Sequence, residues 1–295
     1  MFQTEIDRLR RFHRLVTREA GALDQSFLGR GRPLGAARVL NAIGREICEV
    51  GEIRAYLGLD SGLMSRLLRG LEDEGLIETV AAPDDARRRV CRLTAAGRAE
   101  FEAYEQISNS RAQALLDRHP DRAALLAAMD LISAALGQNS LVFVAVDPRS
   151  EPARACLDRY FAELARRLRT GFEVHLSRDP EAQDMLAPKG VFLLALSDGV
   201  PLGCAGLKGH HDDPSAPWGE VKRVWVDPAA RGLGLASRLM DELTRHARGL
   251  GMGLLRLDTN TALPEALALY RRLGWSEIDR FNDDPYPDAF FEKHL

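Results

Sequence analysis

The residues with the clearest potential for chemistry form a glycine-rich turn at 231–237, between an apolar strand and a helix. Gly232 and Gly234 allow the backbone to approach a ligand closely. Unpaired N–H groups at the start of the following helix can bind a pyrophosphate. Two common phosphate loops are excluded, because no Lys follows the second glycine and the third glycine of a dinucleotide fingerprint is absent. Taken alone, the turn is weak evidence for a phosphate site.

The turn and two later segments together resemble the motifs of one protein family. Arg231-x-x-Gly234-x-Ala236 resembles the R/Q-x-x-G-x-G/A signature of the GNAT N-acetyltransferases. Residues 266–275 resemble the A-x-x-L-Y-x-x-L-G-F/W segment of that family, and residues 290–295 resemble its last strand. The resemblance covers about residues 141–295, and it implies an enzyme that transfers acetyl from acetyl-CoA to an amine.

The resemblance also implies a set of contacts to acetyl-CoA. The amides of 232–237 would bind its pyrophosphate, and the backbone of Val224 and Val226, on a splayed strand, would pair with its pantetheine arm. An N–H group there would polarise the thioester carbonyl. A neutral amine would attack directly, without a covalent enzyme intermediate. The implied cofactor-binding residues are Val224, Trp225, Val226, Arg231, Gly232, Leu233, Gly234, Leu235, Ala236 and Ser237.

Direct attack requires the ammonium to lose a proton, and the departing thiolate benefits from gaining one. Glu220 lies where several members of the family carry a catalytic glutamate, and Tyr270 is placed as the general acid for the CoA sulfur. The alternative for Glu220 is a surface strand residue paired with Lys222, and for Tyr270 a packed aromatic residue with a satisfied hydroxyl. Many members carry an Asn six or seven residues before the tyrosine. Leu263 and Pro264 stand there, so that contact is lost or made differently.

Neither a metal site nor a disulfide is indicated. A loop expected at 210–213 contains His210, His211, Asp212 and Asp213, which either line the amine site or are solvated. Adjacent histidines rarely bind one ion together, so no metal is expected. The cysteines form no C-x-x-C pair, which fits a reducing cytosol; they are Cys48, Cys91, Cys156 and Cys204.

Residues 51–77 carry the pattern of a helix-turn-helix. A short helix and a turn lead to a second helix, which Asp60 or Ser61 can cap. One face of that helix is apolar, and the other presents hydroxyl groups and arginines suited to a major groove. A β hairpin at 80–94 follows, with arginines that can reach a minor groove or phosphates. Helical hairpins and solvated charge runs are common, but the two elements in this order favour DNA binding. The predicted DNA-binding residues are Ser61, Ser65, Arg66, Arg69, Arg87, Arg88 and Arg89.

This order of motifs resembles the MarR family of winged-helix regulators over about residues 35–100. The resemblance rests on Leu59-Asp60-x3-Met64-Ser65-Arg66-x4-Leu71-Glu72-x2-Gly75-Leu76-Ile77, then Asp85-x-Arg87 and Leu93-Thr94-x2-Gly97. It implies a homodimer, built from helices at about 3–20 and 95–136, that binds palindromic double-stranded DNA. The residues expected to give one of these helices a shared apolar face are Phe101, Tyr104, Ile107 and Leu115. Members often carry Asp-Arg at the wing tip, where this chain has Asp85-Ala86.

The length of 295 residues predicts two domains, with a boundary after residue 138. Residues 1–138 are interpreted as a mainly α winged-helix domain for DNA binding and dimerisation. Residues 139–295 alternate strands and helices, which indicates an α+β GNAT domain with a mixed, mostly antiparallel sheet. No signal peptide is visible, and no apolar run approaches the roughly 20 residues of a membrane span, so a cytoplasmic location is expected.

The charge balance limits the kind of DNA binding that is possible. Lys and Arg number 40 against 43 Asp and Glu, a net charge of -3, which excludes a non-specific coat of nucleic acid. Residues 1–140 hold 20 Arg, no Lys and 20 acidic residues, so they are neutral. Binding must come from placed arginines and the two half-sites of a dimer, so the affinity should be modest and strongly salt-dependent.

The sequence therefore predicts a bifunctional protein, a transcriptional regulator fused to an N-acetyltransferase. Its acceptor is a small amine, a protein lysine or an N-terminus. The alternative is a regulator whose second domain senses acetyl-CoA or an amine with little or no turnover. The presence of both Glu220 and Tyr270 favours catalysis.

Overall fold

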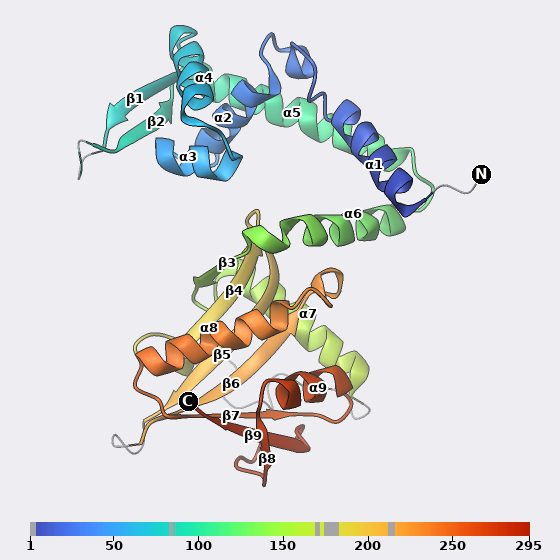
Figure 1. The fold of residues 1–295 in the computed structure, drawn as a ribbon, viewed down its shortest axis with the longest axis vertical. Helices are drawn as coiled ribbons and strands as arrows, with labels where there is room; N and C mark the ends of the chain where they lie inside the picture. Colours follow the sequence, from blue (N-terminus) through green and yellow to red (C-terminus); the bar gives the residue numbers. More distant parts are fainter. Residues whose placement is uncertain (1–3, 83–84, 86, 169–171, 174–182, 212–215) are drawn as a thin grey trace. The chain divides into compact units, whose positions relative to one another are not determined.

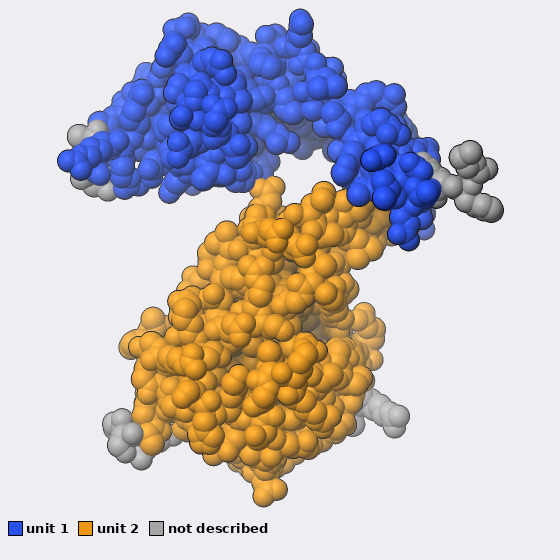
Figure 2. Space-filling model, viewed as in Figure 1, with its two compact units in different colours: residues 1–122 blue, residues 123–295 orange. Residues whose placement is uncertain are grey.

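A computed structural model describes all of the chain except residues 1–3, 83–84, 86, 169–171, 174–182 and 212–215. It divides into two compact units, residues 1–122 and 123–295 (Figure 2). The predicted boundary after residue 138 lies at the end of α6 (Arg122–Gly137), whose buried Ala134 belongs to the core of the second unit. The limits of the two domains stay a prediction. No helix in the described ranges is long and apolar enough to cross a membrane.

The first unit is mainly helical, as predicted. Its elements are α1 (Glu5–Glu19), η1 (Phe27–Gly29), α2 (Leu34–Gly44), α3 (Val50–Leu57), α4 (Ser61–Asp73), β1 (Ile77–Ala81), β2 (Arg89–Leu93) and α5 (Ala95–Asp117). Apolar side chains of α2, α3 and α4 form its core, among them Leu40 and Ile53. α2 ends at Gly44, since Glu46 is left-handed (φ 69°) and Glu49 already bridges to Val90.

Local signals define the helix-turn-helix. Gly58 ends α3 in the left-handed conformation (φ 63°), and the Asp60 side chain caps α4 by accepting the N–H of Leu63 at 2.8 Å. Gly75, with φ 69°, follows the end of α4. Between these signals α4 buries one apolar stripe, so its opposite face is exposed.

Two apolar side chains of α5 do not lie in the surroundings that were predicted for them. Tyr104 is only 4% exposed, stacks on Phe27 at 5.9 Å and belongs to the core of its own unit, against which Phe101 also packs. The expectation that Tyr104 faces a second copy is therefore wrong. Exposed apolar side chains do occur on α1; they are Ile6, Leu9, Leu15 and Val16.

In the described ranges, the second unit contains a seven-stranded sheet with the order β3-β4-β5-β6-β7-β9-β8 (Figure 1). Only β6 and β7 among these neighbours are parallel, which confirms the mixed, mostly antiparallel sheet. The elements after α6 are η2 (Gln138–Ser140), β3 (Val142–Ala145), α7 (Glu151–Arg167), η4 (Gln183–Met185), β4 (Val191–Ser197), β5 (Val200–His210), β6 (Trp218–Val226), η5 (Pro228–Ala230), α8 (Leu235–Gly249), β7 (Leu254–Thr259), α9 (Pro264–Arg272), β8 (Ser276–Ile278) and β9 (Ala289–His294).

Helices cover both faces of this sheet. Along β4, Val191 and Leu193 belong to the core beside α8, whereas Phe192 and Leu194 belong to the cluster beside α7. This alternation is expected of a strand, whose successive side chains point to opposite faces. α7 and α8 therefore lie on opposite sides of the sheet (Figure 1).

A bulge and a divergence shape the end of β6. The β5–β6 register shifts between Cys204 and Gly206, and Arg223 on β6 has a φ of 57°. The parallel pairing of β6 with β7 ends at Val221, opposite Leu257. The last residues of β6 are therefore not paired with β7, which opens the sheet directly before the glycine-rich turn.

Candidate functional site

A cavity of about 530 Å³, here called the turn cavity, lies where β6 ends and α8 begins. The predicted cofactor-binding residues that line it are Val224, Trp225, Val226, Arg231, Gly232, Gly234, Leu235, Ala236 and Ser237. Leu233 is not among the lining residues, because its side chain packs against the core of the second unit. The structure thus brings the predicted set, with this one exception, around a single space.

The backbone of the turn suits an anion. Gly232 and Gly234 have φ angles of 79° and 78°, and no atom lies within 4 Å of the place where a Cβ would stand at either residue. Gly234 is the N-cap residue of α8, and no side chain in the described part of the chain caps that helix. Its first N–H groups are therefore available, and the positive end of the helix dipole adds to their attraction for a phosphate.

Charged residues at the rim of the turn cavity are held in place by Glu163 of α7. Its carboxylate accepts hydrogen bonds from Trp225 Nε1 (3.0 Å), Arg231 Nη2 (2.5 Å) and Arg167 Nη1 (3.3 Å). Burial acts to raise the pKa of Glu163, but the bonds from Arg231 and Trp225 lower it overall. Arg167 also pairs with Glu265 of α9. The sequence reasoning missed Glu163 and Arg167, although their i,i+4 spacing places them on one helix face.

A second cavity of about 300 Å³, here called the carboxylate cavity, adjoins the first. Its charged lining comes from β5, β6, β7 and the segment 279–288 between β8 and β9. The residues that line both cavities are Tyr160, Leu164, Val224, Leu263, Ala266 and Tyr270. The two spaces therefore share a wall at the end of β6.

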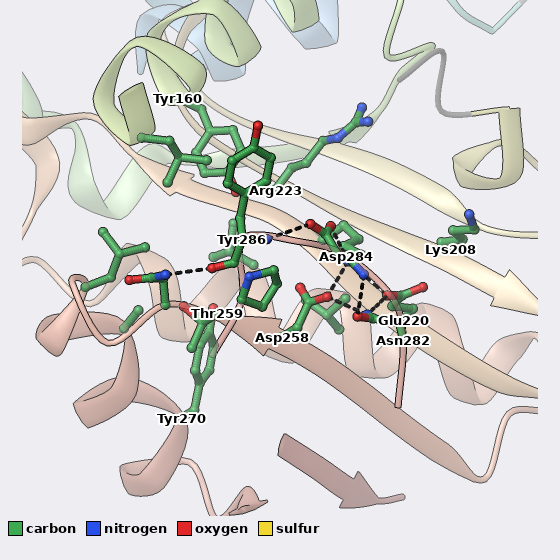
Figure 3. A pocket seen from close by; sticks show the side chains of 18 of the residues that line it. Tyr160, Lys208, Glu220, Arg223, Asp258, Thr259, Tyr270, Asn282, Asp284 and Tyr286 are labelled. Carbon is green, nitrogen blue, oxygen red and sulfur yellow. Dashed lines mark hydrogen bonds and ion pairs between the residues drawn. The ribbon is translucent and has the colours of Figure 1, made fainter. Parts of the chain in front are cut away.

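Five side chains meet in the carboxylate cavity and form the carboxylate cluster: Glu220, Lys222, Asp258, Asn282 and Asp284. Figure 3 labels Glu220, Asp258, Asn282 and Asp284. Lys222 Nζ lies 2.9 Å from Glu220 Oε1, 2.6 Å from Asp258 Oδ2 and 3.8 Å from Asp284 Oδ2. Asn282 Nδ2 donates to Asp258 Oδ2 at 2.6 Å and to Glu220 Oε1 at 3.2 Å. Although burial acts to lower the pKa of Lys222, the charges of Asp258 and Glu220 raise it overall, so the ammonium form is favoured.

Glu220 is buried, with only 5% of its surface exposed, so the alternative of a water-facing residue is wrong although its pairing with Lys222 is present. His210, at the end of β5 rather than in a loop, lies with Nε2 2.9 Å from Glu220 Oε2 and stacks on Trp218 at 3.9 Å. Burial acts to raise the pKa of Glu220, yet the His210 bond and the Lys222 charge lower it to about 2. Glu220 is therefore a stable carboxylate and a weak base.

This low pKa predicts an acid-dependent loss of stability. Because the folded-state pKa of Glu220 lies at about 2 and its ordinary value is 4.5, ionised Glu220 stabilises the fold above pH 4.5, and this contribution is lost as the pH falls towards 2. Its upper limit is about 3 kcal/mol of the free energy of unfolding. We expect Glu220→Gln to destabilise the second unit at pH 7 and the difference from wild type to shrink below pH 4.5.

Denaturant unfolding followed by tryptophan fluorescence measures this effect in the second unit. All three tryptophans, Trp218, Trp225 and Trp275, lie within residues 123–295. Glu102→Gln, on the exposed surface of α5 in the first unit, removes one carboxylate as the control. Parallel pH curves for wild type and Glu220→Gln would contradict the assignment.

Asp258 is the other deeply buried carboxyl group of the cluster, and the sequence reasoning missed it. Burial raises the pKa of Asp258, even though Lys222 and Asn282 act to lower it. A carboxyl group in the otherwise largely apolar strand 254–259 is a signal that could have found it. Asn282 and Asp284 offered no such signal. They belong to no recognisable sequence motif, and only the fold brings their segment to the cavity.

Tyr270, near the end of α9, stands in the wall between the cavities and is 6% exposed. Its ring packs against Trp275 and Phe291, with centroids 6.1 and 5.9 Å away. Burial, and to a smaller extent the charge of Asp258, raises the pKa of Tyr270, so its phenol is protonated at neutral pH.

The predicted DNA-binding side chains lie at the surface of the first unit. The exposed ones on α4 are Ser61, Ser65, Arg66 and Arg69. Arg87 and Arg88, in the turn before β2, and Arg89, its first residue, are also exposed. β1 and β2 pair antiparallel from Ile77–Leu93 to Ala81–Arg89 and form the predicted wing. Arg88 Nη2 lies 2.6 Å from Glu49 Oε2, so part of its charge is neutralised within the unit.

Some of the predicted features fall outside the described residues; they are Pro83, Asp84 and Ala86 of the wing and Asp212 and Asp213 of the loop after β5. In the part of the chain that is described, no three His, Cys, Asp or Glu side chains gather as a metal site. The four cysteines are free thiols.

Comparisons with known proteins agree with both halves of this description. The acetyltransferase (GNAT) family matches residues 157–275 and the MarR family residues 30–88. An IAA acetyltransferase of Azospirillum brasilense is 31% identical over 151 residues, which cover 50% of this chain and 95% of that protein. The N-alpha-acetyltransferase RimI of Mycobacterium tuberculosis is 34% identical over 96 residues, 32% of this chain and 58% of that protein.

Solved structures similar to the chain include both kinds of protein. An acetyltransferase of the GNAT family from Staphylococcus aureus is 18% identical, with a TM-score of 0.46, and covers 52% of this chain and 99% of its own. The reduced form of MarR from E. coli is 24% identical, with a TM-score of 0.36, and covers 41% and 90%. On the acetyltransferase family match and the Azospirillum relative, the chain belongs to the GNAT acetyltransferase family, and residues 30–88 of its first unit match the MarR family.

Proposed function

We propose that the second unit transfers the acetyl group of acetyl-CoA directly to an amine. The observation that carries this proposal is the shared wall, formed by Val224 and Tyr270, between the turn cavity and the carboxylate cavity. One cavity offers a helix start suited to a pyrophosphate, and the other offers buried carboxylates suited to an ammonium. A thioester at the shared wall would lie within reach of an amine from the other side.

The residues of the turn cavity fit acetyl-CoA, which supplies the activated acetyl group when bound. Because the end of β6 is not paired with β7, the backbone groups of Val224 and Val226 can bond the pantetheine amides like an added strand. The N–H groups at the start of α8 can hold the pyrophosphate. Arg231 and Arg167 are charged partners for the remaining phosphate oxygens.

Two proton transfers accompany the reaction. The amine nitrogen bonds the acetyl carbon, the C–S bond breaks, and the amine proton passes to the carboxylate cluster directly or through water. Within the cluster Asp258 is the better acceptor, because burial raises its pKa, whereas the pKa of Glu220 is about 2. Tyr270 donates its proton to the departing sulfur. Glu220 then serves to hold Lys222 and His210 in place.

The glycine turn provides a test of the acetyl-CoA site. We expect Gly234→Ala to weaken acetyl-CoA binding by about tenfold, roughly 1.4 kcal/mol, because a Cβ would stand in the space that the pyrophosphate needs. Gly251→Ala is the matched control, since Gly251 follows the other end of α8 with φ 75° and equally open surroundings. Calorimetric titration measures both, and equal effects of the two substitutions would contradict the site.

Initial rates with both substrates varied test direct transfer. Intersecting lines in double-reciprocal plots are expected, because both substrates must be bound together. Parallel lines, together with an acetylated protein found by mass spectrometry before any amine is added, would indicate a covalent intermediate and overturn the mechanism. Binding of acetyl-CoA without turnover of any amine would instead favour a sensor.

We further propose that the first unit binds palindromic duplex DNA as a homodimer. The exposed hydroxyl and guanidinium face of α4 and the neighbouring wing support the binding, and the exposed apolar side chains of α1 support the dimer. Sedimentation of the intact protein is expected to show two copies per selected DNA site. The affinity for DNA should fall steeply as the salt concentration rises. Residues 1–140 have no net charge, so individual arginines must provide the contacts to the phosphates.

A further inference from the structure

Aromatic rings line the carboxylate cavity together with its charged cluster. On the side nearer Tyr270, Tyr160, Phe161, Phe172 and Tyr286 form a continuous chain of rings, with centroids 5.2, 5.5 and 4.7 Å apart. These rings come from α7, from the segment after it and from the loop before β9. The cavity volume of about 300 Å³ is in the range of small-molecule sites. An apolar organic group would find a matching surface here.

The charges of the cluster do not balance. Glu220, Asp258 and Asp284 carry three negative charges against the one of Lys222. Arg223, whose guanidinium lies over Phe161 at 5.7 Å, adds a second positive charge, so one negative charge remains in excess when His210, 2.9 Å from Glu220 Oε2, is neutral. A positively charged ligand would restore the balance in a site with little water, where such compensation is strong.

The neighbouring cations already have carboxylate partners of their own. Lys208 lies 3.6 Å from Asp184, and Arg256 lies 3.4 Å from Glu292. Asp184 also lies 3.1 Å from Lys189, so its carboxylate is shared by two lysines and neutralises Lys208 only in part. Arg256 does not line the cavity. The site provides carboxylates that can bind an ammonium group and aromatic rings that can contact the carbon atoms attached to it.

We propose that the acceptor is a small primary amine that carries an aromatic ring. The ring would lie against the wall of Tyr160, Phe161 and Tyr286, and the amino group would reach the shared wall at Tyr270 beside Asp258. This inference rests on the proposed acetyl transfer and narrows its acceptor. It distinguishes the site from one that binds short polar amines or the N-terminus of a peptide.

The test compares kcat/KM of the full-length protein for three acceptors, 2-phenylethylamine, n-propylamine and a short peptide with a free N-terminus. We expect 2-phenylethylamine to exceed both others by about ten- to a hundredfold, the range for one added apolar group in a fitted pocket. Equal or better use of n-propylamine or the peptide would overturn this acceptor class and leave acetyl transfer standing. No turnover of any amine, with acetyl-CoA still bound, would overturn both.

A pair of matched substitutions ties the preference to the cavity. Phe161→Leu should lower the ratio of kcat/KM for 2-phenylethylamine over n-propylamine at least threefold. Phe143→Leu is the control, because Phe143 is also half-buried beneath an arginine, with Arg238 at 5.1 Å, but does not line the cavity. An unchanged ratio in Phe161→Leu, or an equal fall in both variants, would overturn the assignment of the ring site.

Discussion

Replacing Tyr270 with Phe is expected to lower kcat for acetyl transfer by about 10²-fold or more, which is the contribution usual for general acid catalysis. The ring would remain packed against Trp275 and Phe291, so the wall between the two cavities should keep its shape. What the substitution removes is the hydroxyl alone, at the wall that Tyr270 forms between the two cavities. The affinity for acetyl-CoA should therefore change by less than about twofold, since the turn cavity is otherwise intact.

Tyr160→Phe is the matched comparison, because Tyr160 lines both cavities as well and burial also raises its pKa. It should reduce kcat far less than Tyr270→Phe. The measurements are single-turnover rates and calorimetric binding of acetyl-CoA for both variants. A large loss in Tyr160→Phe with little change in Tyr270→Phe would move the acid to Tyr160.

Removal of both Arg66 and Arg69 is expected to weaken binding to the selected palindrome by at least about 100-fold. Each arginine that contacts a guanine edge is worth roughly 1–3 kcal/mol, and a dimer would lose each contact twice. Both side chains are exposed on α4, so their loss should not disturb the core of the first unit. The slope of affinity against salt should also become shallower if either contacts a phosphate.

The control for that double variant is Arg245→Ala with Arg248→Ala, which removes the same charge from exposed positions of α8. Fluorescence anisotropy with the selected duplex and with a scrambled duplex separates specific from non-specific binding. Unchanged affinity of Arg66→Ala with Arg69→Ala for the selected duplex would exclude α4 as the element that reads the base sequence.

The parts of the site that could be predicted are those with local signals. The glycine-rich turn needs left-handed φ angles at Gly232 and Gly234, and the helix predicted directly after it is α8. In the same way Asp60 and Gly75 predicted both ends of α4. Such signals act within a few residues, so the sequence displays them directly.

Long-range packing could not be predicted in this way. Glu220 meets Asn282, which lies 62 residues away along the chain, and no pattern in either segment announces the contact. His210 was expected in a loop, but pairing with Trp218 extends β5 to include it. Tyr104 was assigned to a dimer face, whereas η1 folds back onto α5 and Phe27 covers its ring. In each case a partner beyond the nearest neighbours in sequence decided the environment of the residue.

Acetyl transfer without a covalent intermediate is tested best by measuring how many molecules of amide form for each molecule of CoA released. The intact protein is incubated with acetyl-CoA and 2-phenylethylamine, and CoA release is compared with the N-acetyl product quantified by mass spectrometry. The two cavities that meet at Val224 and Tyr270 predict one amide for each CoA, and no CoA release above background without the amine. Tight binding of acetyl-CoA with no amide formed from any amine, or CoA release that does not depend on the amine, would contradict the account.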